Sequence, residues 1–459
     1  MKQSGTFSIC PVCFKKVDAA YVHRNEALYF EKECTEHGTY SCLISRSVDD
    51  FEYWKKETIN IKPKEPLLQV EYGCPYDCGP CENHLQTACC VLIDVTSNCN
   101  QDCAVCFASS VSNDLNEPTL QEIEMKYNKL VCISESRKFN IQLSGGEPTV
   151  RDDLPEIIIM AKAKGFEYVQ LNTNGKRIGM EDGYANVLKS SGLDAVFMQF
   201  DSLDDSVYKE LRNERLVDIK KRALENCRKA KLPVALVPTI VKGINDSEIG
   251  SIIIYALKNI DVVKGIHFQP VSFFGRYPDS FDDSNRFTMF DTINEIQLQT
   301  DGMFLKEDML PISTGHNLCC FYATYSRQED GSYLCTSSMK SKTYSNYCCD
   351  DEPSCSEAPC CPADIEIIKN DRDYVLTKWK MAEAGNSDGF DEFLNRMREN
   401  SFTLTGMAFQ DALTLDTERV RRCRVQSLTN DGRLIPFCLY NITDFDGNYL
   451  YRDKTENQT

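Results

Sequence analysis

The distribution of cysteine is the feature of this sequence that most constrains its fold. The chain has 24 cysteines in 459 residues, and they are clustered rather than scattered. Dense groups lie within residues 10–106 and 319–361, whereas residues 107–318 contain only Cys132 and Cys227. Clustered cysteines in a reducing compartment bind metals more often than they form disulfides. The sequence therefore predicts several metal sites around a cysteine-poor middle.

Composition and charge indicate the compartment of this protein and the classes of partner that it can bind. Charged residues make up 26% and hydrophobic residues 42% of the chain, which is typical of globular domains. The net charge of −18 opposes binding to nucleic acid or to anionic lipid by charge alone. No apolar run reaches the roughly 20 residues that span a bilayer, and the N-terminus lacks the apolar region of a secretory signal. We expect a cytoplasmic protein without a transmembrane segment or a nucleic-acid partner, and at most transient membrane contact.

The cysteine-poor middle alternates apolar, strand-like runs with helix-like stretches. The predicted strands are 91–95, 139–143, 168–171, 195–200, 234–240 and 265–270, and helix-like stretches between them include 120–136, 154–164, 219–231 and 247–257. This alternation favours right-handed crossovers and a parallel sheet. It predicts an α/β fold, a partial (β/α)6 barrel, in which functional groups gather at the C-terminal ends of the strands.

A Cys-x3-Cys-x2-Cys loop follows the first predicted strand, with Cys99, Cys103 and Cys106 as its thiols. Three thiolates can hold three irons of a [4Fe–4S] cluster and leave the fourth iron open. This spacing, with the aromatic Phe107 beside the last cysteine, is the signature of radical S-adenosylmethionine (SAM) enzymes, in which SAM binds the open iron. A closed zinc knuckle would need a fourth ligand at close spacing, which this loop lacks.

Polar residues at the ends of the predicted strands fit a SAM site. Ser144-Gly145-Gly146-Glu147 ends the second strand and resembles the superfamily's motif for the amino group of the methionine part. Turns and helix caps use the same residue types, so each position also has a structural reading. The predicted SAM contacts are Phe107, Ser144, Gly145, Gly146, Glu147, Asn172, Asn174, Gln199, Asp201 and Gln269.

Two further metal sites are predicted upstream of the barrel. A second Cys-x3-Cys-x2-Cys run is followed by a fourth thiol, which predicts a closed auxiliary [4Fe–4S] cluster. Its predicted ligands are Cys74, Cys78, Cys81 and Cys89. His84 is the alternative to Cys89 as the fourth ligand. Two knuckles joined by a strand-like hairpin predict a rubredoxin or zinc-ribbon site for one Zn or Fe; its ligands are Cys10, Cys13, Cys34 and His37, with Cys42 as the alternative to His37.

The motifs together divide the chain into four parts. We predict a ribbon-like metal domain at 1–65, an auxiliary-cluster segment at 66–90, the radical SAM partial barrel at 91–300 and a cysteine-rich C-terminal auxiliary-cluster domain at 301–459. The C-terminal cysteines exceed the needs of one cluster, so their spacing alone does not select a ligand set.

The sequence resembles the archaeal tetraether-lipid synthase family of radical SAM enzymes. The resemblance lies in six segments: Cys74 to Ala108, 142–149, 268–271, 406–412, 418–423 and 435–441. Members of that family are also named hydroxymethylpterin methyltransferases. The resemblance implies a rubredoxin-like site, a SAM cluster and two auxiliary clusters. It also implies Cys423 and Cys438, with one or both of Cys319 and Cys320, as ligands of the second auxiliary cluster. The cysteine pairs within 348–361, and Arg424 beside Cys423, depart from the family's pattern.

The resemblance implies a reaction that begins with a 5′-deoxyadenosyl radical. Our leading hypothesis is carbon–carbon bond formation at unactivated carbons of a lipid or long-chain substrate, with an electron from a ferredoxin or flavodoxin. The alternatives are methylation of a pterin or other small heterocycle, and modification of a peptide. A simple iron–sulfur electron carrier would not need the SAM-site loops. A long apolar tunnel at the barrel mouth would favour the lipid, and a short polar pocket the heterocycle.

Overall fold

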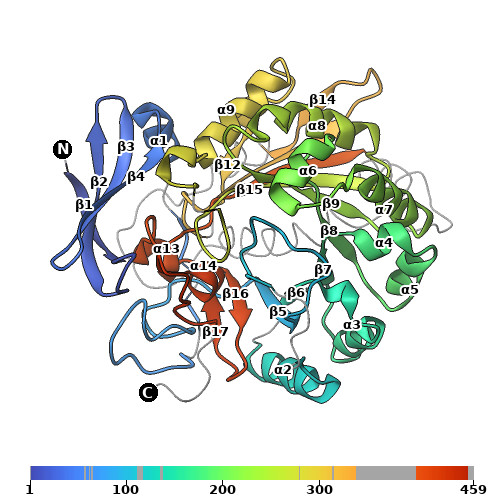
Figure 1. The fold of residues 1–459 in the computed structure, drawn as a ribbon, viewed down its shortest axis with the longest axis horizontal. Coiled ribbons are helices and arrows are strands. Elements are labelled where there is room, and N and C mark those ends of the chain that lie inside the picture. Colours follow the sequence, from blue (N-terminus) through green and yellow to red (C-terminus); the bar gives the residue numbers. More distant parts are fainter. Residues whose placement is uncertain are drawn as a thin grey trace, which may run out of the picture.

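Figure 1 shows the fold in a computed structural model that describes residues 2–55, 58–60, 62–63, 66–110, 117–134, 138–278, 280–312, 315–337 and 400–452. The segment 348–361, which departs from the family's cysteine pattern, lies outside these residues. It contains Cys348, Cys349, Cys355, Cys360 and Cys361. Among the residues that are described, no helix is both long and apolar enough to cross a membrane.

The N-terminal part is a four-stranded antiparallel sheet. Its strands follow the chain order: β1 (Lys2–Ile9), β2 (Lys16–Arg24), β3 (Ala27–Cys34) and β4 (Gly38–Ser45). The first knuckle, Cys10 to Cys13, forms the turn between β1 and β2, and the second forms the turn between β3 and β4. Helix α1 (Val48–Trp54) follows, capped by Ser47, and its buried Trp54 donates a hydrogen bond from Nε1 to the carbonyl oxygen of Asn317 (2.7 Å).

The cysteine-poor middle forms the predicted strands and helices. The strands are β5 (Cys90–Thr96), β6 (Asn140–Gly145), β7 (Val169–Thr173), β8 (Ala195–Gln199), β9 (Val234–Val237) with β10 (Thr239–Ile240), and β11 (Val263–Pro270). The helices are α2 (Leu120–Ile133), α3 (Leu154–Ala163), α4 (Lys176–Met180), α5 (Tyr184–Ser190), α6 (Asp205–Arg212), α7 (Val217–Lys229), α8 (Ile249–Lys258) and α9 (Met289–Gln299). Neighbouring strands from β5 to β11 pair in parallel, as predicted.

The C-terminal part extends this sheet at both of its edges. Strand β15 (Ser401–Met407) pairs in parallel with β11, and β16 (Val425–Leu428) pairs in parallel with β5, so that β5 and β16 lie side by side (Figure 1). Antiparallel strands complete the edges: β12 (Leu310–Pro311), β13 (Cys320–Arg327) and β14 (Tyr333–Cys335) beyond β15, and β17 (Leu434–Pro436) beyond β16. Two short helices lie in the described C-terminal residues, α13 (Thr417–Arg421) and α14 (Phe437–Asn441). The described C-terminal residues thus build walls of the barrel, whereas the sequence led us to expect a separate domain packed against its opening.

Side-chain alternation along the strands separates the core from the barrel interior. In β5, Val91, Ile93 and Val95 are fully buried and belong to the main hydrophobic core with residues of α2 and α3. Because successive strand residues point to opposite faces, Leu92 points into the barrel. The same alternation brings Gln142 and Ser144 of β6, and His267 and Gln269 of β11, to the interior, where all four line one cavity.

Candidate functional site

A cavity of about 480 Å³ occupies the interior of the barrel. Cys99, Cys103 and Cys106 line it where the parallel strands end. Other lining residues lie near the start of the strands, among them Cys89 just before β5 and Asn140 at the beginning of β6. The cavity therefore extends along the barrel interior. Of the ten predicted SAM contacts, Asp201 alone does not line it.

The three thiols of the Cys99 loop lie in a position that suits a cluster. They make no disulfide, and burial raises the pKa of Cys99 to about 12, with the Glu147 carboxylate and the other two thiols adding to the effect. A thiol with this pKa stays protonated at neutral pH unless a metal displaces the proton. Three neighbouring, partly buried thiols facing a cavity fit three irons of a [4Fe–4S] cluster, as their spacing predicts.

The buried ion pair of Asp201 and Arg212 holds this loop in place. Arg212 Nε donates to Asp201 Oδ2 (2.8 Å), and Arg212 Nη2 donates to Oδ1 (3.0 Å). Arg212 Nη1 also donates to the carbonyl oxygen of Val105, between two of the cysteines (2.7 Å). Burial raises the pKa of Cys103, and the Arg212 guanidinium offsets part of this rise. Asp201 thus positions Arg212, which the sequence did not single out.

Glu147 ties the end of β6 to the end of β7. Its side chain is 1% exposed, and Oε1 accepts hydrogen bonds from Thr149 N (3.0 Å), Thr149 Oγ1 (2.6 Å) and Thr173 Oγ1 (2.6 Å). Oε2 accepts one from Asn174 N (2.6 Å). A carboxylate has about four acceptor positions. Oε2 therefore keeps capacity for one more donor, such as the amino group of the methionine part of SAM.

The two glycines before Glu147 pack against the backbone that leads into the Cys99 loop. Gly145 has a φ of +123°, a conformation that L side chains rarely adopt. A Cβ on Gly146 would lie 2.1 Å from the carbonyl oxygen of Asn98. The absence of a side chain at Gly146 is thus required by the chain's own backbone, beside any contact with SAM.

We predict that Gly146→Val displaces the Cys99 loop. The variant should bind SAM weakly and should also contain less iron, because Asn98 directly precedes the first cysteine. The measurement is SAM affinity together with iron content, and Gly5→Val is the control, because open space surrounds that glycine and its φ is not positive. Wild-type affinity and iron content in Gly146→Val would contradict this packing.

Amide side chains form one wall of the cavity. Asn140 and Gln142 come from β6, Gln170 and Asn172 from β7, Gln199 from β8 and Gln269 from β11. Gln199 is held by Lys220, whose buried ammonium group donates to Gln199 Oε1 (2.9 Å), Gln199 O (2.7 Å) and Asn174 O (2.6 Å). Burial lowers the pKa of Lys220 to about 8. Sequence reasoning found Gln199 and Asn174 but missed the lysine that links them.

Aromatic side chains form another part of the wall. Phe107 packs against Phe437 (ring centroids 5.5 Å apart), which packs against Phe409 (4.6 Å). Phe409 in turn contacts Phe274 (6.3 Å), and all four rings line the cavity. The cavity therefore combines hydrogen-bonding amides with flat apolar surfaces.

The predicted first auxiliary set is only partly gathered. Cys78 accepts or donates a hydrogen bond with Cys74, which together with burial raises the pKa of Cys78, and Cys81 adds to this effect. Cys89 lies at the start of β5 and Cys99 beyond its end; the seven-residue strand separates them by roughly 20 Å. The two predicted clusters therefore cannot share one cube.

The alternative ligand His84 has other partners. Its Nε2 lies 3.0 Å from the carbonyl oxygen of Cys423 and 3.2 Å from Gln426 Nε2. Burial lowers the pKa of His84. Cys89 likewise has a backbone partner, since its Sγ donates to Arg424 O (3.5 Å), so these contacts do not select between Cys89 and His84 as the fourth ligand.

The thiols that the family resemblance assigned to a second auxiliary cluster meet in the same cavity. Cys319, Cys320, Cys423 and Cys438 all line it. Burial raises the pKa of Cys438 to about 12, and the Cys319 thiol adds to this effect. Burial raises the pKa of Cys423 as well, with contributions from Cys438 and Cys319. His316, whose pKa is lowered to about 3 by burial and by two arginines, lies beside them and was not predicted.

The ribbon site has the geometry of a mononuclear metal centre. One ligand atom from each of Cys10, Cys13, Cys34 and His37 lies within 4.8 Å of all the others. His37 Nδ1 lies 3.6 Å from Cys10 Sγ and 3.5 Å from Cys34 Sγ. The backbone N–H of Glu36 and the ring of His37 lower the pKa of Cys34 to about 6, which favours the thiolate that a metal binds. Cys42 instead donates to Asp283 Oδ1 (2.9 Å) and points away from this group.

We predict that His37→Ala loses the mononuclear metal and that Cys42→Ala keeps it. Removing one of four tetrahedral ligands opens the site, and structural zinc sites supply much of the folding energy of small ribbons. Metal analysis of the purified variants should give one Zn or Fe fewer per chain for His37→Ala. The opposite pattern would make Cys42 the ligand.

His267 predicts a pH dependence of stability. It lies in the cavity wall with Nδ1 2.8 Å from Thr405 Oγ1, and burial lowers its pKa to about 4 from an ordinary value of 6.5. Between these values the unfolded chain binds more protons, so the free energy of unfolding should fall as the pH falls from 6.5 to 4. We expect the free energy of unfolding to fall by about 1–3 kcal/mol over this range, less than full burial would give because His267 faces a cavity. Urea unfolding of His267→Gln should show a weaker fall than the wild type, and an unchanged pH profile would contradict the assignment.

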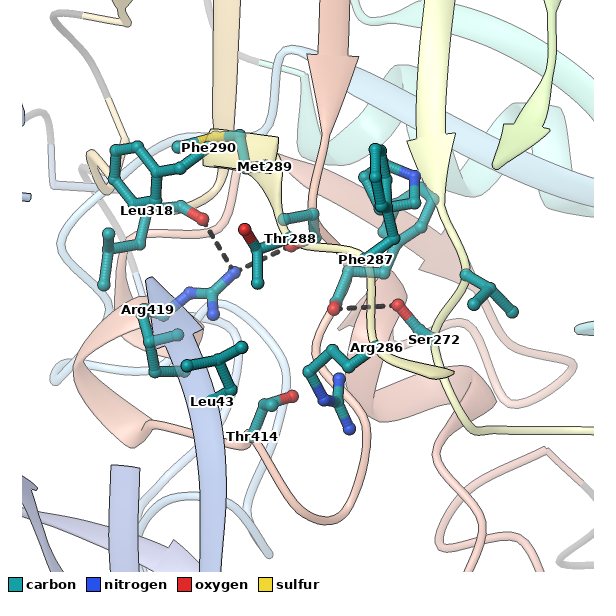
Figure 2. A pocket seen from close by; sticks show the side chains of 15 residues that line it. Leu43, Ser272, Arg286, Phe287, Thr288, Met289, Phe290, Leu318, Thr414 and Arg419 are labelled. Atoms are coloured by element: carbon teal, nitrogen blue, oxygen red, sulfur yellow. Dashed lines mark hydrogen bonds between the residues drawn. The ribbon is translucent and has the colours of Figure 1, made fainter. Parts of the chain in front are cut away.

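A second, smaller cavity of about 50 Å³ lies where the ribbon, the barrel and the C-terminal part meet (Figure 2). Leu43 comes from β4, Ser272 from the loop after β11, and Thr414 and Arg419 from the C-terminal part. Arg286 holds the three parts together: its Nη1 donates to Asp411 Oδ2 (2.9 Å) and its Nε to Asp283 Oδ1 (2.6 Å), the carboxylate that also binds Cys42. The ribbon is thereby anchored to the wall of the large cavity.

Comparison with known proteins gives two family matches. Residues 93–256 match the radical SAM superfamily, and residues 3–46 match the family described as the HMPTM N-terminal zinc ribbon domain. The first covers strands β5 to β9, and the second covers the four-stranded sheet.

Individual relatives extend these matches. The 7,8-dihydro-6-hydroxymethylpterin dimethyltransferase of Methanocaldococcus jannaschii is 33% identical, over 95% of this chain and 93% of its own length. A probable GTP 3′,8-cyclase of Methanothermobacter marburgensis is 30% identical, over 37% of this chain and 53% of its own length. Among solved structures, Streptococcus suis SuiB gives a TM-score of 0.40 at 15% identity and covers 48% of this chain and 47% of its own.

Proposed function

Because this chain belongs to the radical SAM family that includes the 7,8-dihydro-6-hydroxymethylpterin dimethyltransferase of Methanocaldococcus jannaschii, we propose that it methylates a pterin or a similar small heterocycle. It is a radical SAM enzyme, with SAM, a [4Fe–4S] cluster and an N-terminal zinc ribbon. The expected lipid substrate has less support than the pterin, since the relative that aligns along nearly the whole chain carries the pterin name.

We assign the cofactors to the residues of the cavity. Cys99, Cys103 and Cys106 would hold the SAM cluster, which with SAM supplies a 5′-deoxyadenosyl radical able to remove hydrogen from an unactivated carbon. Cys74, Cys78, Cys81 and Cys89 would hold one auxiliary cluster, and Cys319, Cys423 and Cys438 with Cys320 another. Cys10, Cys13, Cys34 and His37 would hold the mononuclear metal. The fit rests on buried or partly buried thiols that form no disulfide and face one cavity or one another.

The remaining residues position the reacting groups. Glu147 Oε2 would accept a hydrogen bond from the SAM ammonium, while Thr149 and Thr173 fix the carboxylate. Arg212 holds the Cys99 loop through Val105 O, and Asp201 holds Arg212. Asn174 Nδ2 donates to Asn100 Oδ1 (2.8 Å), which fastens the loop to the end of β7. The rest of the wall excludes bulk water from the centre of the barrel.

The amide wall is the observation that carries the heterocycle proposal. A pterin has donors and acceptors along one edge and flat apolar faces. Amide side chains offer both a carbonyl oxygen and an NH₂ group, and Gln142, Gln170 and Gln269 can present them to one ligand. The rings of Phe107, Phe409 and Phe437 provide the apolar surface on which a flat ring can stack.

Coupling of long-chain substrates is the second candidate. The cavity extends from the Cys99 loop toward Cys89 and Asn140 near the start of the strands, farther than a bicyclic ring needs. The thiols in its wall would place an auxiliary cluster near a substrate radical. The amide of Gln142 argues against this candidate, because burying it against an alkyl chain would leave a polar group without a partner.

The domain limits and the electron donor complete the proposal. We assign 1–65 to the ribbon, 66–90 to the first auxiliary cluster, 91–300 to the barrel and 301–459 to the second cluster, although strands of the last part are continuous with the barrel sheet. A small reducing protein such as a ferredoxin or flavodoxin would deliver the electron.

The test is turnover of 7,8-dihydro-6-hydroxymethylpterin by the anaerobically reconstituted full chain with SAM and dithionite. Mass spectrometry should detect methylated pterin, and the pterin should increase the rate of 5′-deoxyadenosine formation. Gln142→Leu should raise KM for the pterin about tenfold, the effect of one lost buried hydrogen bond of roughly 1.4 kcal/mol. Gln299→Leu, on the outer helix α9, should leave KM unchanged. Unmethylated pterin would reject the proposal.

A further inference from the structure

Arg419 is a buried cation in the wall that separates the two cavities. Its side chain comes from α13 and the residue is 4% exposed. It lines both the large cavity and the small one shown in Figure 2. Burying a charge is costly unless an opposite charge or a full set of hydrogen bonds compensates it.

Among the described residues, the partners of Arg419 supply no such charge. Nη2 donates to the carbonyl oxygen of Leu318 (3.0 Å), as Figure 2 shows, and to that of Ala408 (2.7 Å). Nε has no hydrogen-bond partner. Within the part of the chain that the structure describes, no carboxylate lies within ion-pair distance of Arg419, as the salt bridges of that part show.

Three other buried arginines of the described residues, Arg151, Arg212 and Arg286, form ion pairs. Arg212 has Asp201 at 2.8 Å and Arg286 has Asp411 at 2.9 Å. Arg421 and Arg422, in and directly after α13, share Glu418, each at 2.6 Å. Arg419 therefore differs from these arginines because it has no carboxylate partner among the described residues, although its burial matches that of Arg212 and Arg286.

Thiols take the place of the missing carboxylate. Leu318, whose carbonyl Arg419 binds, directly precedes Cys319, and Cys423 lies one helical turn after Arg419. Cys319 and Cys438 raise the pKa of Arg419 against the lowering effect of burial. The other groups near it are the Tyr21 phenol of the ribbon, which donates to Asp416 Oδ2 (2.8 Å), and His316, which is neutral above pH 3 or so.

We propose that Arg419 is the counter-charge of an anionic iron–sulfur group held by Cys319, Cys423 and Cys438, and that it raises the reduction potential of that group. This inference rests on the second auxiliary cluster proposed above. A fixed positive charge beside a cluster stabilises the reduced form, which carries one more negative charge, and charge and hydrogen bonds to the sulfurs are known determinants of cluster potential. Arg419 is thus a positioning and tuning residue rather than a catalytic one.

The competing explanation is a purely structural role. In that case Arg419 only ties the segment before Cys319 to the end of β15 through the two carbonyls. The variants Arg419→Lys and Arg419→Gln separate the two roles. Lysine keeps the charge and loses the planar fork, whereas glutamine keeps an NH₂ donor and loses the charge.

The experiment is a redox titration of the anaerobically reconstituted full chain, followed by electron paramagnetic resonance, with iron analysis of each sample. Arg419→Gln should shift one cluster signal to more negative potential by at least 59 mV, a tenfold change in the one-electron equilibrium constant. Arg419→Lys should stay near the wild type. Arg421→Gln is the matched control, because Glu418 already pairs that charge, and it should shift nothing.

Each outcome decides the inference. An unshifted potential in Arg419→Gln with full iron content would overturn it, and so would equal loss of the cluster in both Arg419 variants, which would make the role structural. Loss of the cluster in Arg419→Gln alone would support it. Cys438→Ala tests the premise separately: if its iron content equals that of the wild type, the proposed ligand set fails, whatever the potential of the Arg419 variants.

Discussion

The triple variant Cys99→Ala/Cys103→Ala/Cys106→Ala is expected to produce no 5′-deoxyadenosine from SAM. All three thiols line the large cavity, and the loss of all three would leave the SAM cluster without protein ligands. The iron content should fall by one [4Fe–4S] cluster only, because Cys89 and Cys99 lie at opposite ends of β5. The measurements are anaerobic SAM cleavage with dithionite and iron and sulfide analysis.

Cys132→Ala is the matched control for that variant. Cys132 is an exposed cysteine near the end of α2, so its loss should change neither SAM cleavage nor iron content. Residual SAM cleavage in the triple variant would contradict the assignment of the loop. Loss of all iron would contradict separate clusters.

Arg212→Met is expected to destabilise the protein by about 3–5 kcal/mol, the usual effect of removing one partner of a buried ion pair. Asp201 is fully buried, and methionine would leave its carboxylate with only Gln199 Nε2 and Thr239 N as charge-compensating donors. The bond to Val105 O would also be lost, so the Cys99 loop should hold its cluster less firmly. Urea unfolding measures the first effect and the iron content measures the second.

The double variant Asp201→Asn/Arg212→Met gives the decisive comparison. It removes the uncompensated charge, so it should be more stable than Arg212→Met alone, as expected for two coupled residues. Arg228→Met removes a half-exposed pair with Asp261 and should cost no more than about 1 kcal/mol. Equal losses in Arg212→Met and Arg228→Met would refute the supporting role of Asp201 and Arg212.

The local signals of the sequence were sufficient for the central barrel. Apolar runs of strand length, separated by amphipathic helices, predict parallel strands without further information, and every one of the six predicted runs overlaps a strand. The Cys99 loop and the glycines after β6 were found because their chemistry depends on residues close together in the chain. The two family matches agree with both features.

Features that depend on distant contacts were missed. Arg212, Lys220 and Arg419 are recognisable only once their burial and partners are known, since arginine and lysine on a helix usually face solvent. The joining of β15 to β11 and of β16 to β5 depends on pairing between segments more than 130 residues apart, which no local pattern encodes. Asp201 was found for its position at a strand end, but its carboxylate does not line the cavity and instead binds Arg212, which does.

The most direct test of the proposed function is a competition between two substrates in one anaerobic reaction. Reconstituted protein is given SAM, dithionite, 7,8-dihydro-6-hydroxymethylpterin and a long-chain isoprenoid lipid, and the products are identified by mass spectrometry. We predict methylated pterin, formed together with 5′-deoxyadenosine, and unchanged lipid. Carbon–carbon coupled lipid with unchanged pterin would contradict the account.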